Sequence, residues 1–126
     1  MATNHNIIYI GESRDGLIKI GMTQQTPYRR CCGTDYTIRY FCDAGKNACT
    51  RQQLFEAERL LRLMMNGKFP HKASTDYYYG DMLQAIGLFY IAMPHIENAT
   101  GIKFGEVKEN CPWCDVLGLL DELEEE

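Results

Sequence analysis

Two short apolar segments near the start of the chain constrain its fold most. Residues 7–11 and 17–21 are rich in isoleucine, and the segment between them ends in Asp15-Gly16. Asp-Gly is a favoured dipeptide in the tight turns that connect antiparallel strands. The pattern therefore predicts a β-hairpin, which makes an antiparallel sheet the starting point for the rest of the chain.

A short helix and a third strand are expected after the hairpin. Thr26 before Pro27 is typical of a helix start, and Gly33 is typical of a helix end, so residues 27–32 are expected to be helical. Residues 36–42 alternate tyrosine and isoleucine with threonine and arginine, which predicts a strand. Together with the hairpin, this strand predicts a small three-stranded antiparallel sheet.

Longer helices are expected to flank that sheet. Thr50 and Gln53 have the spacing of a capping box and predict a helix up to about residue 65. Asp81 is placed to cap another helix, which Pro94 is expected to end near residue 92. Residues 77–79 are expected to form a short strand or edge segment. The fold class is therefore α+β, with a C-terminal helical extension.

The length of the chain favours a single domain. With 126 residues and 45% hydrophobic composition, it suits one hydrophobic core. We expect residues 1–80 to form the core unit and residues 81–126 to form a helical, acidic extension packed on the same domain. The first residues are polar, and the most apolar stretch, residues 85–93, is too short to cross a bilayer. A soluble, cytoplasmic protein without a membrane partner is the expectation.

Charge is distributed unevenly along the chain. Residues 1–75 hold eleven Lys and Arg against six Asp and Glu, a balance of +5. Residues 76–126 hold two against eleven, a balance of -9, which gives the net charge of -4. The first part can present a basic face to phosphates, so the overall negative charge does not exclude DNA.

The six cysteines leave two further interpretations open. Cys111 and Cys114 have metal-ligand spacing, and a structural zinc would need two more ligands from among Cys31, Cys32, Cys42 and Cys49. The same pair also resembles a redox motif, but without the expected position at the start of a helix. We expect the thiols to be reduced in a cytosolic protein.

Side chains suited to phosphodiester hydrolysis are spread over the predicted hairpin, helices and loop. A carboxylate can hold Mg²⁺ together with water, an arginine can clamp phosphoryl oxygens, and a nearby base can deprotonate the attacking water. Each of these residues also has an ordinary interpretation, as a packed aromatic or a solvated surface charge. The missing side chain at Gly21 is expected to let a backbone or a phosphate approach. The candidates are Tyr9, Lys19, Gly21, Arg29, Arg30, Glu58 and His71.

The order and spacing of these residues resemble those of the GIY-YIG endonuclease superfamily. The resemblance is closer to the phage and bacterial branch, in which the second motif reads KIG. It covers residues 6 to about 80, and its parts follow the family's order along the chain. The matching segments are Ile7-Ile8-Tyr9, Lys19-Ile20-Gly21, Pro27-Tyr28-Arg29-Arg30, Ala57-Glu58-Arg59-Leu60-Leu61-Arg62 and Asp76-Tyr77-Tyr78.

The resemblance implies an endonuclease or nickase that hydrolyses DNA phosphodiester bonds with Mg²⁺ or Mn²⁺. Tyr9 would act as the general base or position the water, and Lys19 would lower its pKa. Arg30 would hold the scissile phosphate, and Glu58 would bind the metal. Without an added DNA-reading module, sequence specificity would depend on a homodimer or on a protein partner.

Three further residues have roles that the sequence leaves open at the expected site. Arg29 is the near alternative to Arg30 and a candidate for substrate binding. Glu56 competes with Glu58, because either carboxylate can also pair with an arginine on the same helix. His71 lies in the predicted loop, where it can exchange a proton with substrate or simply face solvent.

The chain also departs from the family pattern at three positions. Ile7 stands in place of the glycine of the first motif, Lys19 in place of the tyrosine of the second, and Arg62 in place of the helix histidine. These departures and the acidic final third lead to a second hypothesis. A catalytically weak GIY-YIG fold can serve as a protein-binding or inhibitor module, for example in conflict between phage and host.

Overall fold

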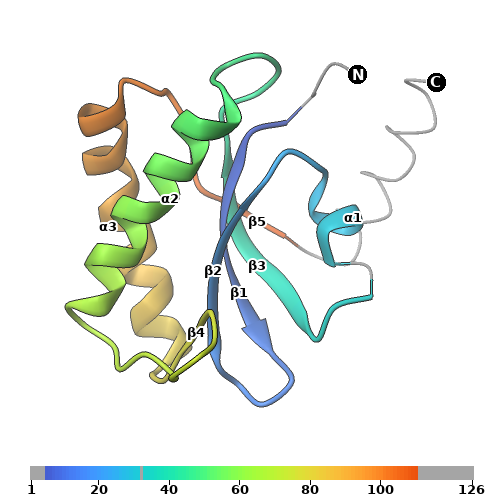
Figure 1. Cartoon of the computed structure of the whole chain (residues 1–126), viewed down its shortest axis with the longest axis vertical. Coiled ribbons are helices and arrows are strands. Elements are labelled where there is room, and N and C mark those ends of the chain that lie inside the picture. The colour runs from blue at the N-terminus through green and yellow to red at the C-terminus, as the bar shows by residue number, and fades with distance from the viewer. Residues whose placement is uncertain (1–4, 32, 111–126) are drawn as a thin grey trace.

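The computed structural model describes residues 5–31 and 33–110 of the chain (Figure 1). Within these ranges the chain forms five strands and three helices. In chain order they are β1 (Ile7–Ser13), β2 (Ile18–Thr23), α1 (Pro27–Cys31), β3 (Tyr36–Asp43), α2 (Arg51–Asn66), β4 (Tyr77–Tyr78), α3 (Met82–Thr100) and β5 (Lys108–Glu109).

The strands form a single sheet in the order β4-β2-β1-β3-β5, and every neighbouring pair is antiparallel. The predicted α+β class, an antiparallel sheet flanked by helices, is confirmed. The predicted number of three strands is wrong, because β4 and β5 extend the sheet at its two edges. β4 lies within residues 77–79, where a short strand or edge segment was expected. β5 has only two residues, which is too short to show the alternation that identifies a strand in a sequence.

The hairpin of β1 and β2 is confirmed. The amide of Ser13 donates to the carbonyl of Leu17 over 2.9 Å, and Gly16 takes a φ of 81° in the turn. The register places Tyr9 directly opposite Gly21. Because residues directly opposite one another on antiparallel strands share a face of the sheet, the aromatic side chain lies above the glycine.

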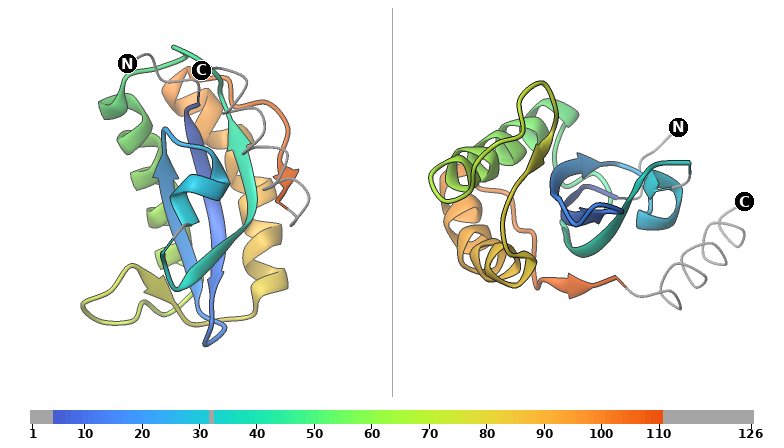
Figure 2. Two further views of the ribbon diagram at one scale, coloured as in Figure 1. Left: turned by 90° about the vertical axis from the view of Figure 1, so that its right-hand side faces the viewer. Right: turned by 90° about the horizontal axis from the view of Figure 1, so that it is seen from below.

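Helices cover both faces of the sheet. α2 and α3 lie on one face, and α1 lies on the other (Figure 2). The face under α2 and α3 contains most of the buried apolar side chains, which we call the helix-side core. Its buried members include Ile8, Ile10, Ile18, Ile20, Cys42, Leu54, Ala57, Leu61, Met65, Ala85, Phe89, Ala92, Met93 and Ile96.

The face under α1 carries a smaller group of buried side chains, the tyrosine-side cluster. It consists of Ile7, Tyr9, Tyr36 and Ile38. β3 contributes to both groups because its pairing with β1 shifts by one residue between Ile10 and Gly11, which leaves an extra residue in β3.

The start of α2 agrees with the capping-box prediction. The hydroxyl of Thr50 accepts a hydrogen bond from the amide of Gln53 over 3.1 Å, and the side chain of Gln53 accepts one from the amide of Thr50 over 2.8 Å. Both bonds satisfy amides that a helix start otherwise leaves without partners. The helix is thereby fixed at the end that faces the site described below.

α3 is longer than expected, because Pro94 does not end it. The helix continues to Thr100 and ends at Gly101, which adopts a left-handed conformation with a φ of 76°. Pro94 is exposed, whereas Met93 and Ile96 on either side of it are buried in the helix-side core. Tertiary packing therefore holds both halves of the helix in place and outweighs the local preference of proline.

No helix in residues 5–31 or 33–110 is long and apolar enough to cross a membrane. Cys111, Cys114 and the acidic end of the predicted extension lie outside the described residues.

Candidate functional site

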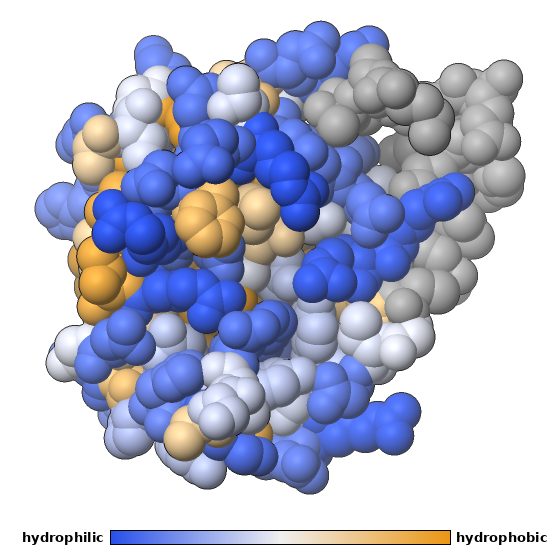
Figure 3. Space-filling model, in the orientation of Figure 1, coloured by the Kyte–Doolittle hydropathy of each residue, from blue (hydrophilic) through white to orange (hydrophobic). Residues whose placement is uncertain are grey.

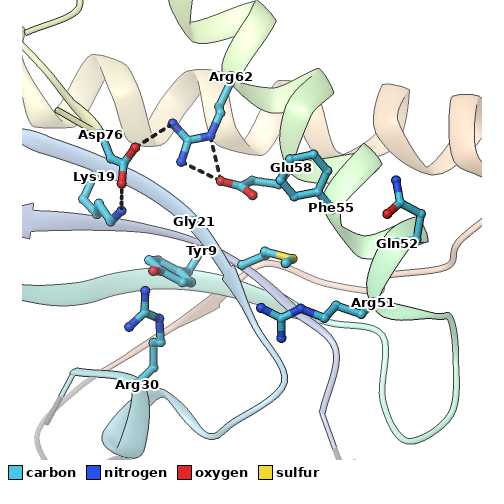
Figure 4. A pocket seen from close by; sticks show the side chains of 11 residues that line it. Tyr9, Lys19, Gly21, Arg30, Arg51, Gln52, Phe55, Glu58, Arg62 and Asp76 are labelled. Carbon is cyan, nitrogen blue, oxygen red and sulfur yellow. Dashed lines mark hydrogen bonds and ion pairs between the residues drawn. The ribbon is translucent and has the colours of Figure 1, made fainter. Parts of the chain in front are cut away.

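A cleft of about 540 Å³ is lined by side chains from β1, β2, α1, α2 and the segment before β4 (Figure 4). Five of the seven residues selected from the sequence lie in its lining: Tyr9, Lys19, Gly21, Arg30 and Glu58. The full lining is Tyr9, Lys19, Gly21, Met22, Arg30, Arg51, Gln52, Phe55, Glu58, Arg62 and Asp76.

The other two selected residues lie outside this lining. Arg29 is exposed on α1, next to Arg30. His71 is exposed in the loop before β4, where its ring centroid lies 5.1 Å from that of Tyr78. The structure therefore distinguishes Arg30 from its neighbour, and it places His71 beside the sheet edge.

Tyr9 is fully buried, with 0% of its surface exposed to solvent. Its hydroxyl shares a hydrogen bond of 2.8 Å with the hydroxyl of Tyr36, and the two rings are stacked with centroids 6.0 Å apart. Burial raises the pKa of the Tyr9 phenol, and the bond to Tyr36 adds to the rise, whereas Arg30 acts in the opposite direction. The net direction is upward, so the phenol is protonated at neutral pH.

The sequence assigned Lys19 to lowering the pKa of Tyr9, but the net shift of that pKa is upward. The pKa of Tyr9 is raised, and the cation that acts against the rise is Arg30. Lys19 is engaged elsewhere: its ammonium lies 3.3 Å from a carboxylate oxygen of Asp76 and 5.5 Å from the ring centroid of Tyr36. It holds the carboxylate of Asp76 on the sheet side of the cleft.

Gly21 makes room for Tyr9. A Cβ atom added to Gly21 would lie 3.0 Å from Cε1 of Tyr9 and still closer to its Cζ and hydroxyl oxygen. The space left by the missing side chain is thus filled by the phenol of the same protein. Gly21 nevertheless lines the cleft, so the expected approach of a phosphate to this glycine stays a prediction.

Glu58 is almost completely buried, at 5% exposure, and forms an ion pair with Arg62 one helical turn later. Oε1 of Glu58 accepts hydrogen bonds from Nε of Arg62 over 2.7 Å and lies 2.6 Å from its Nη2. Oε2 takes no hydrogen bond from the described part of the chain. Arg62 also donates to the carbonyl of Ile20 over 3.2 Å, so its side chain is fixed between α2 and β2.

Asp76 completes a chain of charges across the cleft. Its Oδ2 pairs with Lys19, and its Oδ1 lies 3.7 Å from Nη1 of Arg62 (Figure 4). Burial acts to raise the pKa of the Asp76 carboxyl, but Lys19 and Arg62 outweigh this effect and hold the pKa below its ordinary value. The carboxylate is therefore charged, and it neutralises part of the charge on the two cations.

The cleft has an excess of positive charge. Its lining contains four cations, Lys19, Arg30, Arg51 and Arg62, against the two carboxylates of Glu58 and Asp76. Lys19 and Arg62 form ion pairs with these carboxylates, whereas Arg30 and Arg51 form no ion pair within residues 5–31 and 33–110. The uncompensated charge of about +2 therefore lies on Arg30 and Arg51, where it can attract an anion.

Sequence reasoning did not select Arg51 and Phe55, although the sequence contains a signal for them. Arg51, Phe55, Glu58 and Arg62 follow one another at spacings of four, three and four residues. Residues at these spacings lie on one face of a helix. All four line the cleft. Once Glu58 was selected, helical spacing alone would have identified the other three.

The described residues offer few ligands for a metal. Within residues 5–31 and 33–110 no group of three or more His, Cys, Asp and Glu side chains is arranged to hold an ion. Of the candidate zinc ligands, Cys42 and Cys49 are free thiols, and burial raises the pKa of Cys42 to about 12. Cys32, Cys111 and Cys114 lie outside the described residues.

Comparison with models of protein families, with curated proteins and with solved structures finds no match to this chain.

Proposed function

We propose that the cleft binds a phosphate of a DNA backbone and that the protein is a metal-dependent endonuclease or nickase of the GIY-YIG type. The observation that carries this proposal is the meeting of Tyr9, Lys19, Arg30 and Glu58 in one cleft. These residues come from four different elements, and they were selected by their order along the sequence alone. Such a convergence of a phenol, cations and a carboxylate suits phosphodiester hydrolysis.

The distribution of charge supports a phosphate as the ligand. Arg30 and Arg51 carry the uncompensated positive charge of the cleft and enter it from α1 and α2 (Figure 4). Arginine binds phosphoryl oxygens with paired hydrogen bonds. We assign the phosphate to the space between these two guanidinium groups, which places it near the phenol of Tyr9.

Tyr9 is assigned a positioning role. Its phenol is protonated at neutral pH, because burial and the bond to Tyr36 raise its pKa. A neutral phenol can orient an attacking water or a phosphoryl oxygen through a hydrogen bond, but it does not remove a proton until its own proton has left. The hydroxyl of Tyr36 holds the phenol in place through a hydrogen bond of 2.8 Å.

Glu58 is the residue proposed to hold Mg²⁺ or Mn²⁺. Its Oε2 accepts no hydrogen bond from the described residues, while Oε1 is held by Arg62. Mg²⁺ is often bound by one or two carboxylates together with water and substrate phosphate oxygens, and the donor set fits this arrangement. When bound, the ion neutralises phosphate charge and stabilises the leaving oxygen.

Nicking of supercoiled plasmid with Mg²⁺ or Mn²⁺ tests the proposal, and the chain provides matched controls. Glu58→Gln and Arg30→Ala are each expected to lower the cleavage rate by roughly 100-fold, the cost typical of removing one charged group from such a site. Glu56→Gln and Arg29→Ala change neighbours that lie outside the cleft lining and are expected to leave the rate unchanged. Equal losses in both sets would refute the assigned site, and no cleavage by the wild type at high protein concentration would refute the nuclease.

One observation favours the second candidate, a binding or inhibitor protein without cleavage. Arg62 stands in place of the family's histidine and neutralises the carboxylate proposed as the metal ligand. Replacement by Arg62→His distinguishes the two candidates. An active wild type that loses activity in the variant assigns Arg62 to positioning Glu58. An inactive wild type that gains metal-dependent nicking in the variant supports the binding protein.

A further inference from the structure

An aromatic side chain lies among the charged residues of the cleft without an assigned role. Phe55 on α2 is 49% exposed and lines the cleft. Its neighbour Leu54 packs in the helix-side core, so α2 does not need Phe55 for its attachment to the sheet. The view of this face shows a small hydrophobic area surrounded by hydrophilic residues (Figure 3).

The surroundings of Phe55 distinguish it from the other exposed apolar residues of α2. Arg51 lies one helical turn before it and Glu58 one turn after it. The phenyl ring therefore stands between the proposed metal ligand and a cation that has no ion pair in the described part of the chain. Leu63 on the same helix is 54% exposed but does not line the cleft. Met22, at the end of β2, gives the cleft a second apolar contact near its cations.

This combination has a known physical use in proteins that bind single-stranded nucleic acid. A cationic groove follows the phosphates, while aromatic rings stack on the flat faces of the bases. A base inside a duplex is stacked on its neighbours and cannot offer its face to a side chain. An aromatic ring beside a phosphate site therefore selects for a nucleotide whose base is unpaired or turned out of the helix.

The size of the cleft agrees with this class of ligand. Its volume of about 540 Å³ lies within the range of roughly 300–1,000 Å³ that is usual for sites of small-molecule size. A single nucleotide falls in this size class.

We propose that Phe55 stacks on the base adjacent to the phosphate held by Arg30 and Arg51, and that the preferred substrate is a nucleic acid with an unpaired nucleotide at the cleft. This inference rests on the proposed binding of a backbone phosphate in the same cleft. It adds a substrate class, namely single-stranded segments, flaps or junctions, to the proposed phosphodiester chemistry. It assigns Phe55 to substrate selection.

The test compares two labelled strands of equal length by fluorescence anisotropy, in EDTA so that no cleavage occurs. One strand is oligothymidylate, and the other is an abasic strand with the same phosphates but no bases. The wild type is expected to bind oligothymidylate roughly 5- to 10-fold more tightly, the lower part of the range for one stacked base because Phe55 is only half exposed. Phe55→Ala is expected to abolish this preference, and Phe55→Trp to keep it.

Two further variants separate stacking from charge and from general effects on α2. Arg51→Ala is expected to weaken the binding of both strands by a similar factor, because it contacts phosphate alone. Leu63→Ala removes an exposed apolar side chain from the same helix and is expected to change neither affinity. The circular dichroism of each variant checks that the fold is retained.

The outcomes distinguish a failure of the inference from a failure of the proposed function. If the wild type binds both strands equally, or if Phe55→Ala keeps the preference, the stacking role of Phe55 is overturned while phosphate binding stands. If neither strand binds, or if both bind but Arg30→Ala changes neither affinity, the proposed phosphate site itself is overturned, and the inference fails with it.

Discussion

Replacing Gly21 with alanine is expected to destabilise the protein through its contact with Tyr9. The added Cβ would lie 3.0 Å from Cε1 of the tyrosine ring, and closer to Cζ and the hydroxyl oxygen, whereas ordinary van der Waals contact begins at 3.4 Å. The ring cannot turn aside freely, because it is fully buried and stacked on Tyr36. The substitution must therefore displace the phenol or separate β1 from β2.

The expected cost has two parts. Extra volume in a packed interior usually costs about 1–3 kcal/mol. Displacing the phenol also disturbs its buried hydrogen bond to Tyr36, and the loss of such a bond costs about 1 kcal/mol. We expect Gly21→Ala to lower the free energy of unfolding by about 3 kcal/mol, which corresponds to a decrease in Tm of roughly 10 °C for a domain of this size.

Urea unfolding followed by far-ultraviolet circular dichroism measures this cost, and a second substitution isolates its cause. In a Tyr9→Leu background the phenol is absent, so Gly21→Ala is expected to cost less than about 0.5 kcal/mol. The coupling energy between the two sites would then exceed about 2 kcal/mol, the size expected for residues in direct contact. A similar cost of Gly21→Ala in both backgrounds would show that the phenol is not the cause and would refute the reasoning.

Three further predictions concern parts of the fold outside the cleft. Gly87→Ala is expected to raise the free energy of unfolding by about 0.5–1 kcal/mol, because this exposed glycine lies inside α3 and the added Cβ would meet no atom within 4 Å beyond its chain neighbours and the local helix backbone. A decrease in urea midpoint would contradict this. Thr50→Ala removes the cap of α2 and is expected to cost about 1 kcal/mol in the same assay, whereas an unchanged midpoint would mean that the cap bond adds nothing. Burial acts to raise the pKa of the Asp43 carboxyl, but hydrogen bonds from His5 and from two backbone amides outweigh it and hold the pKa below its ordinary value. The folded protein then binds this proton less readily than the unfolded chain, so the stabilisation is complete above about pH 4 and decreases as the pH falls further. Asp43→Asn is expected to reduce this dependence of stability on pH below about pH 4, and an equally steep dependence in the variant would rule the carboxyl out as its source.

The parts of the fold that the sequence predicted are those that depend on local chemistry. Asp15-Gly16 determines a tight turn, and Thr50 with Gln53 satisfies the amides of a helix start, so both features follow from a few adjacent residues. Pro94 shows the limit of this reasoning. Its local preference ends helices, but buried neighbours on both sides keep α3 continuous.

The candidate site was predictable to the extent that each residue could be assigned to an element. Tyr9 and Gly21 were correctly placed on paired strands, but the sequence did not show that the phenol fills the space above the glycine. The partners of Lys19 and Arg62 were also hidden, because Asp76 approaches both from a loop far along the chain. Such contacts depend on the tertiary path of the backbone, which local sequence patterns do not predict.

The extra residue in β3 links the two faces of the sheet. Arg39 is that residue, since Tyr40 pairs with Ile10 and Ile38 pairs with Gly11. Without it, regular alternation would turn Tyr36 and Ile38 towards the helices, or turn Cys42 away from them. Arg39 itself lies outside the cleft. Deleting it would therefore either remove Tyr36 from its place beside Tyr9 or remove Cys42 from the helix-side core. The geometry of the cleft is in this sense encoded by the length of a strand as well as by the side chains that line it.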